Sequence, residues 1–181
     1  MTLTTKPIAL TINGRQVGPI DVSEGMMMLD FLHDHLNLTG ARMGCGQGIC
    51  HACTVIVENG DGSLREMRTC ITGAHWFAGR RVQTIEGHAV HDANGNLLAL
   101  SPVQQAFIEN FAFQCGYCTP GFVTAATVLL DQLKRKPVSR AELNDVITTA
   151  LDKHICRCTG YVRYLEAVRD LVVKTPGLLT G

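Results

Sequence analysis

Eight cysteines carry the most distinctive chemistry in this chain of 181 residues. By spacing they divide into two groups of four, with none left over. The first cysteine set is Cys45, Cys50, Cys53 and Cys70, and the second cysteine set is Cys115, Cys118, Cys156 and Cys158. Thiolates are soft ligands that hold zinc or iron–sulfur clusters, and paired thiols can instead form disulfides. The spacing within each set must therefore decide between these chemistries.

The first cysteine set begins in a glycine-rich stretch, which reads Gly44-Cys45-Gly46-Gln47-Gly48-Ile49-Cys50-His51-Ala52-Cys53. Its C-x4-C-x2-C spacing with a distant fourth cysteine is the plant-type ferredoxin pattern for a [2Fe–2S] cluster. Glycine reaches positive φ without steric cost, so the backbone of such a loop can bring N–H donors close to sulfur. The pattern therefore predicts a cluster here rather than a zinc ion.

The second cysteine set has the spacing C-x2-C, then 37 residues, then C-x-C. This spacing alone is ambiguous, because structural zinc also takes four cysteines. Two arguments favour iron–sulfur: the first set already implies cluster assembly, and each pair lies near a predicted helix end, where unpaired N–H groups are available. Disulfides are disfavoured, since they need an oxidising compartment and usually a small secreted domain.

Charge and hydropathy exclude several classes of function. Sixteen basic residues balance sixteen acidic ones, so the chain lacks the positive surface of a nucleic-acid binder. No apolar stretch approaches the roughly 18–20 residues of a membrane span. The polar segment 1–7 has no signal-peptide character. The expected compartment is the cytoplasm by default, with the periplasm possible if a partner carries the folded complex through export.

The N-terminal half shows the period of strands. Ile8, Leu10 and Ile12 alternate with polar residues before Asn13-Gly14, which predicts a hairpin. Ser23 is a candidate N-cap for a helix that ends at Thr39-Gly40. Its expected apolar stripe is Met28, Leu29, Leu32, His35 and Leu36, with the run of methionines as core filler. Further strands are expected over 54–57, 64–70 and 82–85. Together these elements predict a small β-grasp sheet with the cysteine loop at one edge.

The C-terminal half shows the period of helices. Four helix starts are predicted from Ser101-Pro102, Thr119-Pro120, the capping box Ser139 to Glu142, and Thr159. Two antiparallel helical hairpins, each with a cysteine pair near a helix end, indicate a four-helix bundle. The expected fold is α+β, with a ferredoxin-like domain over 1–88, a linker over 89–100, a helical domain over 101–174 and a tail over 175–181. The tail has no helical period and is expected to be disordered or to wrap a partner.

The residues around the cysteines add a resemblance to a known family. The stretches Gln114 to Phe122, Ile155 to Tyr161, Gly44 to Gly48 and Ala52 to Val55 resemble the small iron–sulfur subunit of the molybdenum hydroxylases, the xanthine oxidase and aldehyde oxidoreductase family. The resemblance extends from about residue 8 to residue 172. It implies a plant-ferredoxin-like β-grasp domain followed by a four-helix-bundle domain, each with one [2Fe–2S] cluster.

The same resemblance implies a division of labour between subunits. A large molybdopterin-containing partner would oxidise an aldehyde, a purine or an N-heteroaromatic ring. Electrons would then pass through the cluster of the second cysteine set to that of the first, and on to a flavin, a cytochrome c subunit or another acceptor. Gln114 and Cys158 match positions that contact the pterin cofactor in the family. The chain would be the electron-transfer subunit of an oxidoreductase complex, with the catalytic site on its partner.

Nothing in the sequence suggests substrate chemistry on this chain, because no Ser/His/Asp group, phosphate loop or carboxylate pair stands out. The seven histidines are expected to be ordinary surface or packed residues. His51 departs from the family, where many members have glycine. Two interpretations remain open: it tunes the cluster potential or the docking of the acceptor, or it is a tolerated exposed side chain. A free-standing double-cluster ferredoxin and a zinc-stabilised interaction module are the alternative functions.

Overall fold

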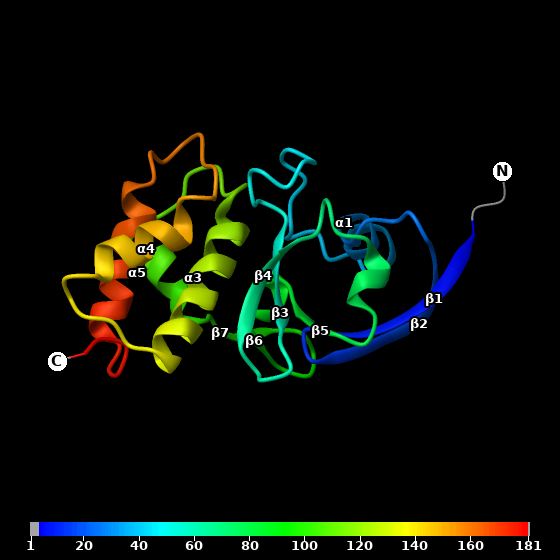
Figure 1. The fold of residues 1–181 in the computed structure, drawn as a ribbon, viewed down its shortest axis with the longest axis horizontal. Helices are drawn as coiled ribbons and strands as arrows, with labels where there is room; N and C mark the ends of the chain where they lie inside the picture. The colour runs from blue at the N-terminus through cyan, green and yellow to red at the C-terminus, as the bar shows by residue number, and fades with distance from the viewer. Residues whose placement is uncertain (1–3, 181) are drawn as a thin grey trace.

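The computed structural model describes residues 4–180 and has a mixed α+β fold (Figure 1). Five strands form one sheet in the order β2-β1-β5-β3-β4. These strands are β1 (Thr5–Ile12), β2 (Arg15–Ser23), β3 (Thr54–Glu58), β4 (Leu64–Arg68) and β5 (Arg81–Gln83). The β1–β5 pair is parallel and the other pairs are antiparallel. The predicted hairpin is confirmed, because β1 and β2 pair across Asn13-Gly14, both at positive φ.

The helix predicted after Ser23 is much shorter than expected. Ser23 is the last residue of β2 rather than an N-cap, and the helical segment consists of α1 (Met28–Asp30) followed by the π-helical turn η1 (Phe31–His35). The wider π register rotates the later side chains away from the 3.6-residue stripe. His35 is therefore exposed and Phe31 is buried instead. Met28 is fully buried in the core of the sheet region, as predicted.

Four helices surround a second hydrophobic core on the other side of the molecule (Figure 1). They are α2 (Pro102–Glu109), α3 (Thr119–Arg135), α4 (Leu143–Leu151) and α5 (Val162–Lys174). A short 3₁₀ turn, η2 (Ala74–Phe77), lies between β4 and β5. Between β5 and the helices the chain forms a second 3₁₀ turn, η3 (Ile85–Gly87), and a small hairpin of β6 (Val90–His91) and β7 (Leu97–Ala99). The hairpin lies within the segment predicted as a linker.

Two of the four predicted helix starts have the predicted capping contacts, and two do not. Ser101 caps α2 reciprocally with Gln104, and Ser139 bonds reciprocally with Glu142 just before α4. In contrast, the N-cap of α3 is Cys118 and that of α5 is Tyr161. The hydroxyls expected to cap these helices have other partners: Thr119 Oγ1 lies 3.0 Å from Tyr164 Oη, and Thr159 Oγ1 donates to Cys156 Sγ at 3.1 Å.

The segment predicted as a free tail packs against its own chain. Leu178 is 1% exposed within the helical core, and Thr180 N donates to Val138 O at 2.9 Å. Burial of one leucine and the returning backbone contact explain why this end is ordered without a helical period. The expectation of disorder or partner wrapping is therefore wrong for residues 175–180. Residues 1–3, at the start of the predicted first domain, and residue 181, at the end of the predicted tail, lie outside the described residues.

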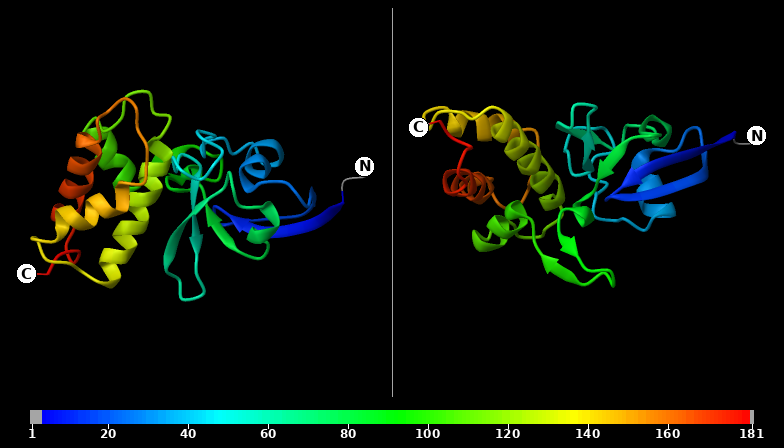
Figure 2. Two further views of the ribbon diagram at one scale, coloured as in Figure 1. Left: turned by 45° about the horizontal axis from the view of Figure 1, so that its top comes forward. Right: turned by 90° about the horizontal axis from the view of Figure 1, so that it is seen from below.

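Helix α3 joins the two halves of the molecule by lying along β3 and β4 (Figures 1 and 2). Thr124 Oγ1 on α3 donates to Thr54 O on β3 at 3.5 Å, and Leu64 N on β4 donates to Asp131 Oδ2 on α3 at 3.1 Å. The second bond fixes the far end of α3 against β4. Of the helices in the described residues, none has the length and apolar character needed to cross a membrane.

Candidate metal centres

The glycines of the first cysteine loop are required by its close packing. A Cβ on Gly44 would lie 2.7 Å from Cys50 Sγ, so any larger residue would displace that thiol. Gly46 and Gly48 have φ values of 67° and 71°, a region that glycine enters at no steric cost. The geometry therefore agrees with the sequence-based reason for glycine here, which is close approach of the backbone to sulfur.

The loop backbone directs three N–H groups at one sulfur. Cys45 Sγ accepts hydrogen bonds from Gln47 N and Ile49 N at 3.3 Å and from Cys50 N at 3.4 Å. Partial burial alone would raise the pKa of the Cys45 thiol, but these donors outweigh it and lower the pKa to about 6. A thiolate is the form that ligates metal. The loop thus holds Cys45 ready for ligation at neutral pH.

The first cysteine set is arranged as two pairs. The Cys45 and Cys50 thiols are partly exposed. Cys53 and Cys70 are both buried, and burial raises the pKa of the Cys53 thiol to about 11. A [2Fe–2S] cluster takes four thiolates, two on each of its irons. Two pairs of thiols with amide donors aimed at sulfur are a donor set that fits this cluster.

The second cysteine set is also arranged as two pairs. Cys115 and Cys158 have their sulfurs 3.5 Å apart and are exposed, as is Gln114. Cys118 is half-buried and Cys156 is buried, so these two form the inner pair. Burial raises the pKa of the Cys118 thiol to about 11. The second set therefore fits the same kind of cluster as the first, with one pair at the surface and one beneath it.

The inner pair of the second set is surrounded by hydroxyl and amide donors. Thr159 donates to Cys156 Sγ through its N at 3.4 Å and its Oγ1 at 3.1 Å. Burial alone would raise the pKa of the Cys156 thiol, but these two bonds outweigh it and lower the pKa. The Tyr164 hydroxyl lies 3.5 Å from Cys118 Sγ. Sequence reasoning missed Tyr164, because nothing in its helical spacing distinguishes it from a core residue.

The fold brings the two cysteine loops together. Ile155 N, next to Cys156, donates to the carbonyl oxygen of Cys50 at 3.2 Å. Nearby, Tyr117 Oη donates to Met43 O at 2.7 Å. A single backbone hydrogen bond therefore joins the loop that contains Cys50 to the loop that contains Cys156.

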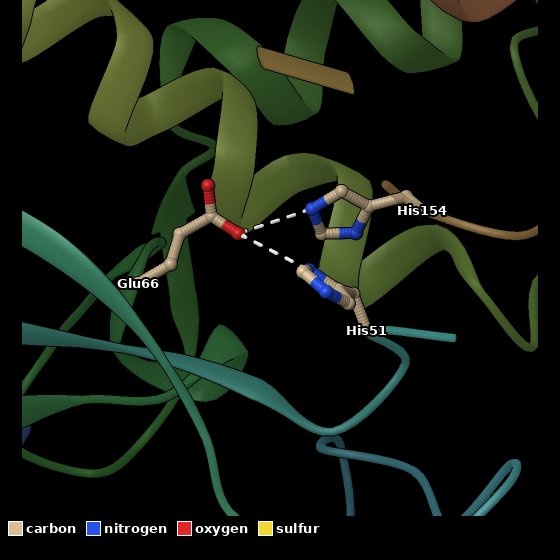
Figure 3. Close-up of side chains that lie close together, drawn as sticks. All are labelled: His51, Glu66 and His154. Carbon is tan, nitrogen blue, oxygen red and sulfur yellow. Dashed lines mark hydrogen bonds and ion pairs between the residues drawn. The ribbon is translucent and has the colours of Figure 1, made fainter. Parts of the chain in front are cut away.

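His51 does not project freely into solvent as one of its two interpretations expected. Its side chain is 13% exposed and faces Glu66 on β4 and His154, which follows α4 (Figure 3). His154 Nε2 lies 3.0 Å from Glu66 Oε2, whereas His51 Nδ1 lies 4.0 Å from the same oxygen. Burial lowers the pKa of His51. Sequence reasoning did not single out Glu66 or His154, because both lie far from His51 in the sequence and meet it only in the folded chain.

Comparisons with known proteins agree with the two-part arrangement. Residues 10–75 match the 2Fe-2S iron-sulfur cluster binding domain, and residues 84–169 match the [2Fe-2S] binding domain. The nicotine 6-hydroxylase small subunit of Paenarthrobacter nicotinovorans is 36% identical over 90% of this chain and 87% of that chain. The aldehyde oxidoreductase iron-sulfur-binding subunit PaoA of Escherichia coli K12 is 34% identical over 91% and 70%. The crystal structure of quinoline 2-oxidoreductase from Pseudomonas putida 86 has a TM-score of 0.76 at 29% identity, covering 96% and 93%.

Proposed function

The chain belongs to the family of small [2Fe–2S] iron–sulfur subunits of the molybdenum hydroxylases, and on that premise we propose that it is the electron-transfer subunit of a molybdopterin-dependent hydroxylase or dehydrogenase. Its finer architecture is a β-grasp ferredoxin-like domain over residues 1–88 and a four-helix-bundle domain over 101–174. The packing of α2 to α5 around one core supports the second assignment.

In this proposal each cysteine set holds one [2Fe–2S] cluster. Cys45, Cys50, Cys53 and Cys70 ligate the distal cluster, and Cys115, Cys118, Cys156 and Cys158 ligate the proximal one. When bound, the clusters supply one-electron transfer between the molybdenum centre of the partner and the final acceptor. The chain's own contribution is to set the environment of the thiolates, through the amides around Cys45 and the hydroxyls around Cys118 and Cys156.

The observation that carries the proposal is the hydrogen bond from Ile155 N to Cys50 O. It connects the backbone of one ligand set to the backbone of the other without an intervening side chain. A double-site protein whose clusters acted independently would not need its two ligand loops in direct contact. A relay does need them close, and the fixed contact of α3 with β3 and β4 keeps them so.

The surface around the second cysteine set suits a large partner. Cys115, Cys158 and Gln114 are exposed there, and Phe111, which precedes them in the chain, is 75% exposed. An exposed aromatic side chain beside a ligand loop is typical of a protein interface. We assign this face to the molybdopterin-binding subunit, with Gln114 and Cys158 as the residues that contact the pterin cofactor.

The substrate class follows from the relatives and belongs to the partner. Their names specify nicotine, quinoline and an aldehyde, so the proposed substrate is an aldehyde or an N-heteroaromatic compound. In this proposal the first cysteine set is the outlet and would deliver electrons to a flavin or cytochrome c subunit.

The test is purification of the native complex with counting of its subunits, iron and sulfide. The proposal expects a much larger chain in stoichiometric amount and about four irons and four sulfides per copy of this chain. Cys45→Ser and Cys118→Ser should each remove one of two distinct cluster signals in electron paramagnetic resonance (EPR) spectra. A coloured protein that purifies alone as a monomer would support the free-standing ferredoxin instead. A colourless zinc protein would refute both.

A further inference from the structure

His51, Glu66 and His154 form a third group of metal-binding side chains, separate from both cysteine sets (Figure 3). One ligand atom from each residue lies within 4.8 Å of the other two. The distances from Glu66 Oε2 are 3.0 Å to His154 Nε2 and 4.0 Å to His51 Nδ1. Atoms at such separations share a central point about 2.4 Å from each, close to the roughly 2.0–2.2 Å of zinc–ligand bonds.

The group contains an unpartnered buried nitrogen that points to a ligand. His51 Nδ1 is buried and has no hydrogen-bond partner among the described residues, and its 4.0 Å separation from Glu66 Oε2 is too long for a hydrogen bond. The second histidine of the group, His154, is 1% exposed. A buried polar atom without a partner is costly and requires an explanation. A cation at the centre would give the His51 lone pair a partner and would share the Glu66 carboxylate.

We propose that His51, Glu66 and His154 form a binding site for a divalent metal ion of the zinc class. Two imidazoles and one carboxylate are an established zinc donor set, with water in the fourth position. A hollow of about 400 Å³ between β4, α3 and α4 has Glu66 in its wall. The proposal is independent of the electron-transfer function.

The site would connect three segments that also carry or adjoin the cysteine sets. His51 follows Cys50 in the first loop, His154 lies two residues before Cys156, and Glu66 lies on β4. Zinc has no redox chemistry of its own. The bound ion would therefore crosslink the two cysteine loops without accepting electrons, and its positive charge would favour the reduced form of either neighbouring site.

The first test measures zinc binding to the purified complex. After chelator treatment, the complex is dialysed against Zn²⁺ and the metal is counted by mass spectrometry, alongside His51→Gly and Glu66→Gln variants. The wild type should bind about one more zinc per chain than either variant, or bind it at least tenfold more tightly. His91→Gly and Glu58→Gln remove an exposed histidine and an exposed carboxylate elsewhere and should match the wild type. Equal binding by the wild type and both site variants would overturn the proposal.

The second test locates the ion. Co²⁺, a paramagnetic substitute for Zn²⁺, should speed the EPR relaxation of both reduced clusters in the wild type and not in His51→Gly. Unchanged relaxation in the wild type would refute a site between the loops. If Glu66→Gln does not assemble, His51→Gly still decides, because glycine suits the positive φ of residue 51. Iron and sulfide counts separate the two proposals, since absent clusters would contradict the electron-transfer function while leaving the zinc count interpretable.

Discussion

Replacing Gly121 with alanine tests whether the close contact of α3 with the first cysteine loop stabilises the protein. A Cβ at this position would lie 2.5 Å from His51 O and 3.1 Å from His154 Nδ1. Real Cβ contacts are essentially never shorter than 3.0 Å, so the loop or the helix must retreat by at least about 0.5 Å. The obstacle is backbone rather than a flexible side chain, so it cannot rotate away.

The His51 carbonyl is also held in place from its other side. It accepts hydrogen bonds from Thr54 N at 3.2 Å and from Thr54 Oγ1 at 2.7 Å. Retreat of the loop would stretch one or both bonds. We therefore expect Gly121→Ala to destabilise the protein by about 1–3 kcal/mol, the usual cost of overpacking. For a chain of this size the melting temperature should fall by roughly 3–10 °C.

The assay is thermal unfolding of the complex, followed by loss of cluster absorbance and by far-ultraviolet circular dichroism. Gly60→Ala is the matched control, since a Cβ there would meet nothing within 4 Å. The two variants undergo the same change in the unfolded chain, so their difference reports the contact. If Gly121→Ala melts within about a degree of Gly60→Ala, the contact adds no measurable stability and the reasoning is refuted.

Three further variants test other contacts. Tyr164→Phe removes the hydroxyl beside Cys118 Sγ; a redox titration should show a lower potential for the proximal cluster only, and an unchanged potential would contradict the hydrogen bond. Leu178→Ala should cost about 2–5 kcal/mol in chemical denaturation, whereas a free tail would cost nothing. Burial lowers the pKa of His88 to about 4. Between about pH 6.5 and 4 the unfolded chain therefore binds a proton that the folded chain does not. The free energy of unfolding should fall by up to roughly 3 kcal/mol as the pH drops through this range. His88→Asn should flatten this pH dependence.

The sequence predicted the elements whose signals are local. The alternation of Ile8, Leu10 and Ile12 before Asn13-Gly14 was enough to predict the first hairpin. Both signals, the two-residue period of a strand and the turn preference of Asn-Gly, depend only on residues close together in the sequence. The N-cap at Ser101 and the capping box at Ser139 were predicted for the same reason. The spacing of the first cysteine set was enough to predict its cluster type, whereas the second set also needed the residues around its cysteines, because structural zinc accepts the same four ligands.

Local signals failed where a tertiary contact competed for the same group. Thr119 and Thr159 are good helix caps in isolation, yet their hydroxyls bond Tyr164 and Cys156. Tyr164 reaches Thr119 only when α5 packs on α3, whereas Cys156 lies three residues before Thr159 in the same loop. The π turn after α1 likewise depends on packing against the sheet rather than on its residues' propensities. At Thr119 a long-range partner outweighed a capping preference worth about 1 kcal/mol.

The sequence pointed to the two cysteine sets and gave no sign of what surrounds them, and His51 shows why. Its φ of 58° costs a non-glycine residue about 1–2 kcal/mol, so the side chain must repay that strain through contacts it makes when folded. The ring packs edge-on against His154, with centroids 4.9 Å apart, and both rings face Glu66. Neither partner is near residue 51 in the sequence, so spacing alone gave no reason for histidine in a position that favours glycine. Once the fold brings three metal-binding side chains to one point, that choice has a physical reason.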